Sequence, residues 1–72
     1  MEIFILADYA EKKIIYATSS FDKLSQKLNQ NLNQAGHPAL IPGLLKAELQ
    51  NTSQIEIKAG KHLYAVTVRL LE

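Results

Sequence analysis

Residues 19–36 constrain the fold more than any other segment, because they carry the complete pattern of an amphipathic helix. Apolar residues recur there at steps of three and four, which places them along one side of a helix with about 3.6 residues per turn: Phe21, Leu24, Leu28, Leu32 and Ala35. Ser19 and Asp22 have the spacing of a capping box, and Gly36 is a typical helix stop. We therefore expect a helix over residues 20–35 whose apolar side is covered by the rest of the chain.

Four segments with the composition of β-strands flank this helix in two pairs. Residues 3–7 are apolar throughout, which predicts a strand in the centre of a sheet, and residues 13–18 form a second β-branched and aromatic run that pairs with it as a hairpin. Residues 54–58 and 63–70 alternate between the two faces of a strand, with a turn at residues 59–61. These runs predict two hairpins, one on each side of a helical centre.

Residues 44–50 fit two patterns. The alternation of Leu45, Ala47 and Leu49 suits a strand. The spacing of four apolar residues suits a helix face instead: Ile41, Leu44, Leu45 and Leu49. We predict a helix, because strong helix formers dominate the segment, no β-branched residue occurs between positions 42 and 51, and Pro42 suits a first turn. The predicted fold is a single α+β domain over residues 1–72, in the order β-β-α-α-β-β, with an antiparallel four-stranded sheet and helices on one face.

The composition is that of a small folded domain. Of the 72 residues, 47% are hydrophobic and only 21% are charged, which excludes the disordered class. The core is thin at this length, and without Cys the chain has no disulfide, so a partner subunit is a natural source of extra stability. A net charge of +1 gives no strong field toward nucleic acid or anionic lipid.

The first residues do not have the pattern of a targeting signal. They lack the basic region and the long apolar core of a signal peptide, so we expect residue 1 to be the mature N-terminus. The longest apolar run, residues 3–7, is far too short to span a membrane. The sequence therefore predicts a cytoplasmic protein with no membrane partner.

A sheet covered on one face leaves the other face open to a partner. In the first strand, either Phe4 and Leu6 or Ile3 and Ile5 must point away from the helices. Tyr9 is an aromatic residue in a predicted turn, where burial is least expected. We select as candidate interface residues the apolar and aromatic positions Phe4, Leu6, Tyr9, Leu63 and Ala65.

The outer face of the first predicted helix offers an alternative, a contact with nucleic acid. Lysine and amide side chains gather there and can contact phosphates or base edges: Lys23, Lys27, Gln30, Asn31 and Gln34. Two lysines without an interleaved aromatic residue make a weak footprint, so nucleic acid is possible as a partner but not favoured.

Enzyme, metal and cofactor motifs are not recognisable along the chain. His37 and His62 have no third ligand at the spacing of a zinc site. The acidic residues are spread singly, no Ser, His and acid set has a known spacing, and Gly36, Gly43 and Gly60 lie too far apart for a phosphate loop. We therefore expect no catalytic residue, metal, cofactor or small-molecule substrate.

Residues 17–24, with the sequence Ala-Thr-Ser-Ser-Phe-Asp-Lys-Leu, follow the first predicted hairpin. This combination of hairpin, Ser-rich cap, aromatic residue and acid–Lys pair resembles the opening of small proteins of phages and prophages of low-GC Gram-positive bacteria. The resemblance covers the first third to half of the chain and implies an accessory phage-type protein that acts by binding. The expected function is a non-enzymatic protein-interaction or regulatory module that binds itself, as a homodimer, or another protein.

Overall fold

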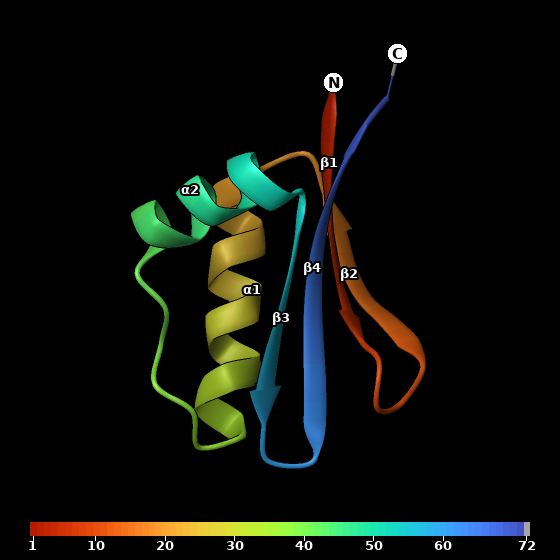
Figure 1. Ribbon diagram of the computed structural model, residues 1–72. Coiled ribbons are helices and arrows are strands. Elements are labelled where there is room, and N and C mark those ends of the chain that lie inside the picture. Colours follow the sequence, from red (N-terminus) through yellow and green to blue (C-terminus); the bar gives the residue numbers. More distant parts are fainter. Residues whose placement is uncertain (72) are drawn as a thin grey trace.

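The computed structural model describes residues 1–71 and has the predicted order of elements, β-β-α-α-β-β (Figure 1). The elements are β1 (Glu2–Asp8), β2 (Lys13–Thr18), α1 (Phe21–Gln34), α2 (Pro42–Thr52), β3 (Gln54–Ala59) and β4 (His62–Leu70). The four strands form one antiparallel sheet in the order β2-β1-β4-β3, and both helices lie on the same side of it. The predicted α+β class is confirmed, as is the central position of the first strand.

The central pair of strands, β1 and β4, joins the two ends of the chain. Its register places Leu6 opposite Val66 and Asp8 opposite Tyr64. Beyond the last pair, the backbone N–H of Leu71 donates to the Met1 carbonyl at 2.7 Å, so the first and last described residues lie side by side (Figure 1). At the opposite end, the Tyr9 N–H donates to the Leu63 carbonyl at 2.8 Å, which extends this pairing past the end of β1.

The core lies between the sheet and α1. Leu24, Leu28 and Leu32, which repeat every four residues along α1, are fully buried, as are Leu6 and Val66 on the sheet. Burying one such side chain contributes about 1.5–3 kcal/mol, so this stripe is a main source of stability in so short a chain. The helix α1 packs against β1 and β2, whereas α2 packs against β3 and β4.

Helix α1 begins one residue later than the capping-box prediction places it. The N-cap is Ser20 rather than Ser19, and the Ser20 hydroxyl accepts the Lys23 N–H at 3.3 Å. The Ser20 N–H itself donates to the Thr18 hydroxyl at 3.1 Å, which ties the cap to the end of β2. Phe21 then occupies the first turn, with its ring edge-on to Phe4 at 5.6 Å between centroids. This contact and the Thr18 hydrogen bond fix the helix start, which the residue spacing alone could not.

Helix α2 confirms the helical prediction for residues 44–50. Pro42 lies at its first turn, Leu45 and Leu49 are buried, and Ser53 ends it in a left-handed conformation with φ of 62°. The link from α1 to α2 is held by Asn29, whose side chain accepts the Leu40 N–H at 2.9 Å and donates to the Leu40 carbonyl at 3.2 Å.

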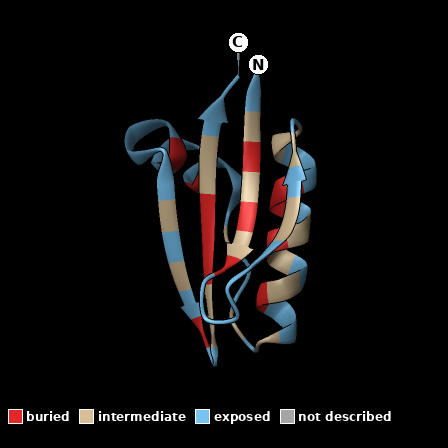
Figure 2. Ribbon diagram, turned by 90° about the vertical axis from the view of Figure 1, so that its right-hand side faces the viewer, coloured by how far each residue is buried: buried red, intermediate tan, exposed pale blue. Residues whose placement is uncertain are grey.

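The face of the sheet away from the helices is uncovered (Figures 1 and 2). Burial alternates along β1, and the residues of the helical face, Phe4 and Leu6, are 7% and 0% exposed. Of the two alternatives for the first strand, the structure therefore selects Ile3 and Ile5 for the open face. The choice of Phe4 and Leu6 as interface residues is wrong, because the Phe21 ring and the α1 leucines cover this side of β1.

Candidate functional site

Two hollows meet at the end of the sheet where the β1–β2 turn lies. One is apolar and belongs to the uncovered face. The other is polar and lies on the helical side, between the start of β2, the start of β4 and α1. Each collects residues that are separate in the sequence, so each is a candidate site.

The apolar hollow has a volume of about 400 Å³ and is lined by Ala7, Tyr9, Lys12, Lys13 and Ile14. Ile14 stands opposite Ala7 in the β1–β2 pairing and is 70% exposed, although it is a large apolar residue. A bulge lies beside this pair, because Leu6 pairs with Tyr16 and Ala7 with Ile14, which leaves Ile15 without a partner on β1. Bulges bend a strand and redirect its side chains.

The three other candidate interface residues differ in accessibility. Tyr9 is 44% exposed, and its hydroxyl accepts a hydrogen bond from the Gln54 side chain at 3.3 Å. Ala65 is only 1% exposed although it faces away from the helices, and Leu63 is half-buried. Tyr9 is thus the accessible member of the predicted set, and the accessible apolar surface lies toward β1 and β2 rather than β4.

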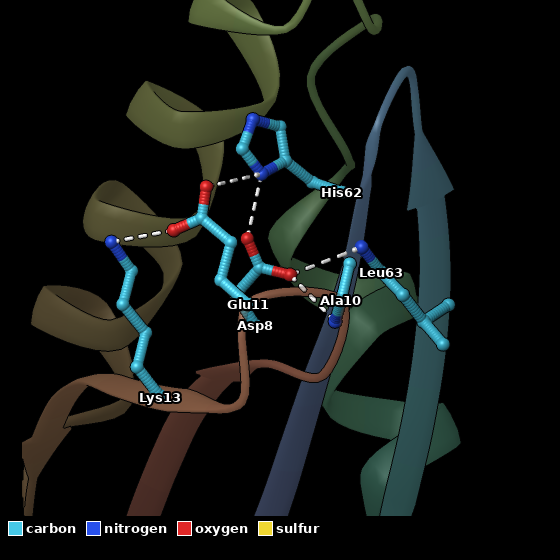
Figure 3. Close-up of polar contacts among 6 residues, drawn as sticks. All are labelled: Asp8, Ala10, Glu11, Lys13, His62 and Leu63. Carbon is cyan, nitrogen blue, oxygen red and sulfur yellow. Dashed lines mark hydrogen bonds and ion pairs between the residues drawn. The ribbon is translucent and has the colours of Figure 1, made fainter.

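The polar hollow has a volume of about 320 Å³. Its lining combines ionisable and apolar side chains from both hairpins and one residue of α1: Asp8, Glu11, Lys13, Ile14, Ile15, Asn31, His62 and Tyr64. Asp8 ends β1 and His62 begins β4, so antiparallel pairing of these strands brings the two residues together. The β1–β2 turn then carries Glu11 back toward them (Figure 3).

Asp8 is the buried centre of this hollow, with 1% of its surface exposed. One carboxylate oxygen, Oδ1, accepts the backbone N–H groups of Ala10 at 3.0 Å and Leu63 at 3.3 Å. The other oxygen, Oδ2, lies 2.6 Å from His62 Nδ1 (Figure 3). Burial alone raises the pKa of Asp8, but the hydrogen bonds from His62 and the backbone outweigh it and hold that pKa below 3.8. Asp8 is therefore a carboxylate at neutral pH.

Glu11 and Lys13 complete the ionic cluster. Glu11 Oε2 lies 2.8 Å from Lys13 Nζ, and Glu11 Oε1 lies 3.9 Å from His62 Nδ1. The hydrogen bond and charge of Glu11 raise the pKa of Lys13 above 10.5. Burial, together with the charges of Asp8 and Glu11, raises the pKa of Tyr64 above 10.0, and its ring stacks on His62 at 5.3 Å. At neutral pH the hollow thus holds the Asp8 carboxylate, the Lys13 ammonium group and the neutral Tyr64 phenol.

The candidate nucleic-acid residues lie on α1 as predicted, but they differ in exposure. Lys23, Gln30 and Gln34 are exposed, whereas Lys27 and Asn31 are half-buried. The Asn31 side-chain amide donates to the Lys27 carbonyl of the same helix at 2.8 Å and also lines the polar hollow.

Sequence reasoning missed the grouping of Asp8, Glu11 and His62, because it considered spacing along the chain. Asp8 and His62 are 54 residues apart. A usable signal was present: Asp8 ends the first strand and His62 starts the last one, so the two become neighbours if those strands pair antiparallel. The other histidine, His37, is not part of this group. Its Nδ1 lies 2.7 Å from the Pro38 carbonyl oxygen.

No family model matches the chain, and neither does any curated protein or solved structure. Within residues 1–71, neither helix has the length and apolar character needed to cross a lipid bilayer. What can be said of function therefore comes from the two hollows.

Proposed function

We propose that this protein is a small non-enzymatic interaction module that associates with a second copy of itself through the uncovered face of its sheet. The observation that carries the proposal is Ile14, which is 70% exposed beside the apolar hollow formed with Ala7 and Tyr9. A projecting apolar side chain and an apolar hollow on one patch suit a two-fold symmetric interface, because each copy can supply both parts.

The charge of the chain permits this pairing. The net charge is only +1, so two copies do not repel strongly over long range. The outer strand β3 contributes exposed Glu56 and Lys58 to the open side of the sheet, opposite in sign and close to its apolar centre. A polar rim of this kind around an apolar centre is usual for protein interfaces.

The small size of the face favours a weak association. Four strands about 4.8 Å apart and seven residues of about 3.3 Å each give a flat area near 440 Å², below the roughly 800 Å² per partner of a standard interface. We therefore expect a reversible dimer with a micromolar dissociation constant, formed and lost with changes in protein concentration.

The test is the solution mass of the protein by sedimentation, with light scattering at the upper end, from about 0.1 µM to about 100 µM, a range that brackets a micromolar dissociation constant. The parent chain, with a monomer mass of 8.1 kDa, should approach twice that mass at the upper end. Ile14→Glu should remain monomeric, because two like charges would meet across the two-fold axis. The matched control is Ile41→Glu, since Ile41 is 65% exposed but precedes α2 on the other side of the sheet; this variant should dimerise like the parent.

A parent chain that keeps the monomer mass throughout this range would overturn self-association. Loss of the dimer in Ile41→Glu but not in Ile14→Glu would overturn the choice of surface. A nucleic-acid-associated factor using Lys23 and Lys27 stays the alternative; a shift of labelled DNA at low salt that weakens steeply as salt rises would favour it. A prophage origin and a cytoplasmic location stay predictions from the sequence.

A further inference from the structure

We propose that Asp8, Glu11 and His62 bind one divalent transition-metal ion, zinc by preference, at the polar hollow. One ligand atom from each of these residues lies within 4.8 Å of those of the other two. Asp8 Oδ2 and Glu11 Oε1 both face His62 Nδ1. Figure 3 shows the two carboxylates converging on the same ring nitrogen. One imidazole nitrogen and two carboxylate oxygens form a donor set that suits zinc, whereas magnesium and calcium prefer oxygen ligands alone.

The spacing of these atoms is close to that around a metal ion. Ligands about 2.1 Å from a tetrahedral ion lie about 3.4 Å from one another. His62 Nδ1 is 2.6 Å from Asp8 Oδ2 and 3.9 Å from Glu11 Oε1. To admit the ion, the His62–Asp8 distance must lengthen and the His62–Glu11 distance must shorten, each by less than about 1 Å. Glu11 is 47% exposed in its side chain and His62 33%, so both have room to move.

Each carboxylate is already held by one oxygen and has the other aimed at His62. The backbone N–H groups of Ala10 and Leu63 occupy Asp8 Oδ1, and the Lys13 ammonium group occupies Glu11 Oε2. Partners of this kind fix the orientation of ligands in metal sites. The imidazole binds through Nδ1 in the tautomer whose proton is on Nε2, so the ion takes the position of the hydrogen bond to Asp8.

The charge and the space around the cluster also suit a cation. The side chains of Asp8 and Glu11 lie close together beside the His62 ring, and the Lys13 ammonium group forms an ion pair with Glu11, so the cluster has two acidic side chains for one paired lysine. The hollow of about 320 Å³ that opens beside the three residues has room for water as a fourth ligand. The nearby ammonium group weakens cation binding, so we expect a dissociation constant in the micromolar range rather than below it.

The test is a calorimetric titration of the full chain, freed of metal by a chelator, with zinc chloride, and a parallel titration with magnesium chloride. The parent should bind one zinc ion per chain, and magnesium at least about tenfold more weakly. Glu11→Gln and His62→Gln should each weaken zinc binding by at least about tenfold. The matched controls, Glu48→Gln and His37→Gln, alter an exposed acid on α2 and the only other histidine and should bind like the parent.

A second measurement locates the ion. The chain has only two histidines, so the His62 ring signals are easily assigned by NMR, and zinc should shift them while leaving those of His37 in place. Absence of zinc binding by the parent, or binding that survives both Glu11→Gln and His62→Gln in folded protein, would overturn the proposal. The circular dichroism spectrum of each variant establishes that it is folded, and neither result bears on self-association through Ile14.

Discussion

Asp8 is the residue on which the polar end of the sheet depends. Its carboxylate accepts hydrogen bonds from two backbone N–H groups and lies 2.6 Å from His62, so it ties the β1–β2 turn to the start of β4. Throughout residues 1–71, each buried side-chain nitrogen or oxygen has a hydrogen-bond partner, and Asp8 meets this condition although it is almost fully buried. Because these hydrogen bonds favour the ionised form of Asp8, the stability of the fold depends on its charge.

The lowered pKa of Asp8 predicts a loss of stability in acid. Because the pKa is below 3.8 in the folded state, the unfolded chain takes up the proton more readily, and the free energy of unfolding falls as pH falls. The contribution of Asp8 is complete above about pH 5 and is lost as pH decreases through 3.8 and below. Asp8→Asn should lower the melting temperature at pH 7 by several degrees and flatten the decline of stability below about pH 5. Thermal unfolding followed by circular dichroism, from about pH 2.5 to about pH 7 with a chelator present, measures both effects.

The control for this prediction is Asp22→Asn, at the only other aspartate. Asp22 is exposed in the first turn of α1, where it acts only through the helix dipole. Asp22→Asn should lower the melting temperature at pH 7 by less than Asp8→Asn does. It should leave the fall of stability in acid unchanged. Equal pH profiles for the parent and Asp8→Asn would contradict the role given to Asp8.

At the scale of the elements, short-range chemistry accounts for most boundaries. The predicted ranges 13–18 and 54–58 differ from β2 and β3 by no more than one residue, and Gly60 starts the β3–β4 turn with φ of 61°. A two-residue hairpin turn whose first residue has positive φ favours glycine there. The start of α1 is the exception, since the choice between Ser19 and Ser20 depends on Thr18 and on the contact of Phe21 with Phe4.

The assignment of the cap can be tested by two neighbouring substitutions. Ser20→Ala removes the acceptor of the Lys23 N–H and should lower the free energy of unfolding by about 0.5–2 kcal/mol. Ser19→Ala alters an exposed residue outside the helix and should change it by less than about 0.5 kcal/mol. Urea denaturation of the two variants gives the comparison, and a larger effect at Ser19 would restore the capping box that the sequence suggested.

At the scale of the whole molecule, the helices leave one face of a thin domain open. The apolar surface on this face is concentrated at β1 and β2, because Ala65 on β4 is buried while Ile14 on β2 is not. A second copy on this surface would stabilise the folded state by mass action, because the unfolded chain does not bind it.

Self-association therefore predicts a melting temperature that depends on protein concentration. A hundredfold increase in concentration above the dissociation constant should raise the melting temperature of the parent by several degrees. Ile14→Glu should melt at the same temperature throughout the range, and Ile41→Glu should behave like the parent. Differential scanning calorimetry at several concentrations measures this, and a concentration-independent parent would contradict the proposed dimer.

The sequence by itself determined the elements, their order and the covered side of α1, because helix periodicity, strand alternation and turn residues act over a few neighbours. It could not determine which side of β1 is buried, since residues 3–7 are apolar on both sides and only packing against Phe21 and the α1 leucines separates them. Nor could it determine the meeting of Asp8, Glu11 and His62, because strand order and register place them together across 54 residues of chain. Tertiary structure alone decided these two features, and both proposed sites rest on them.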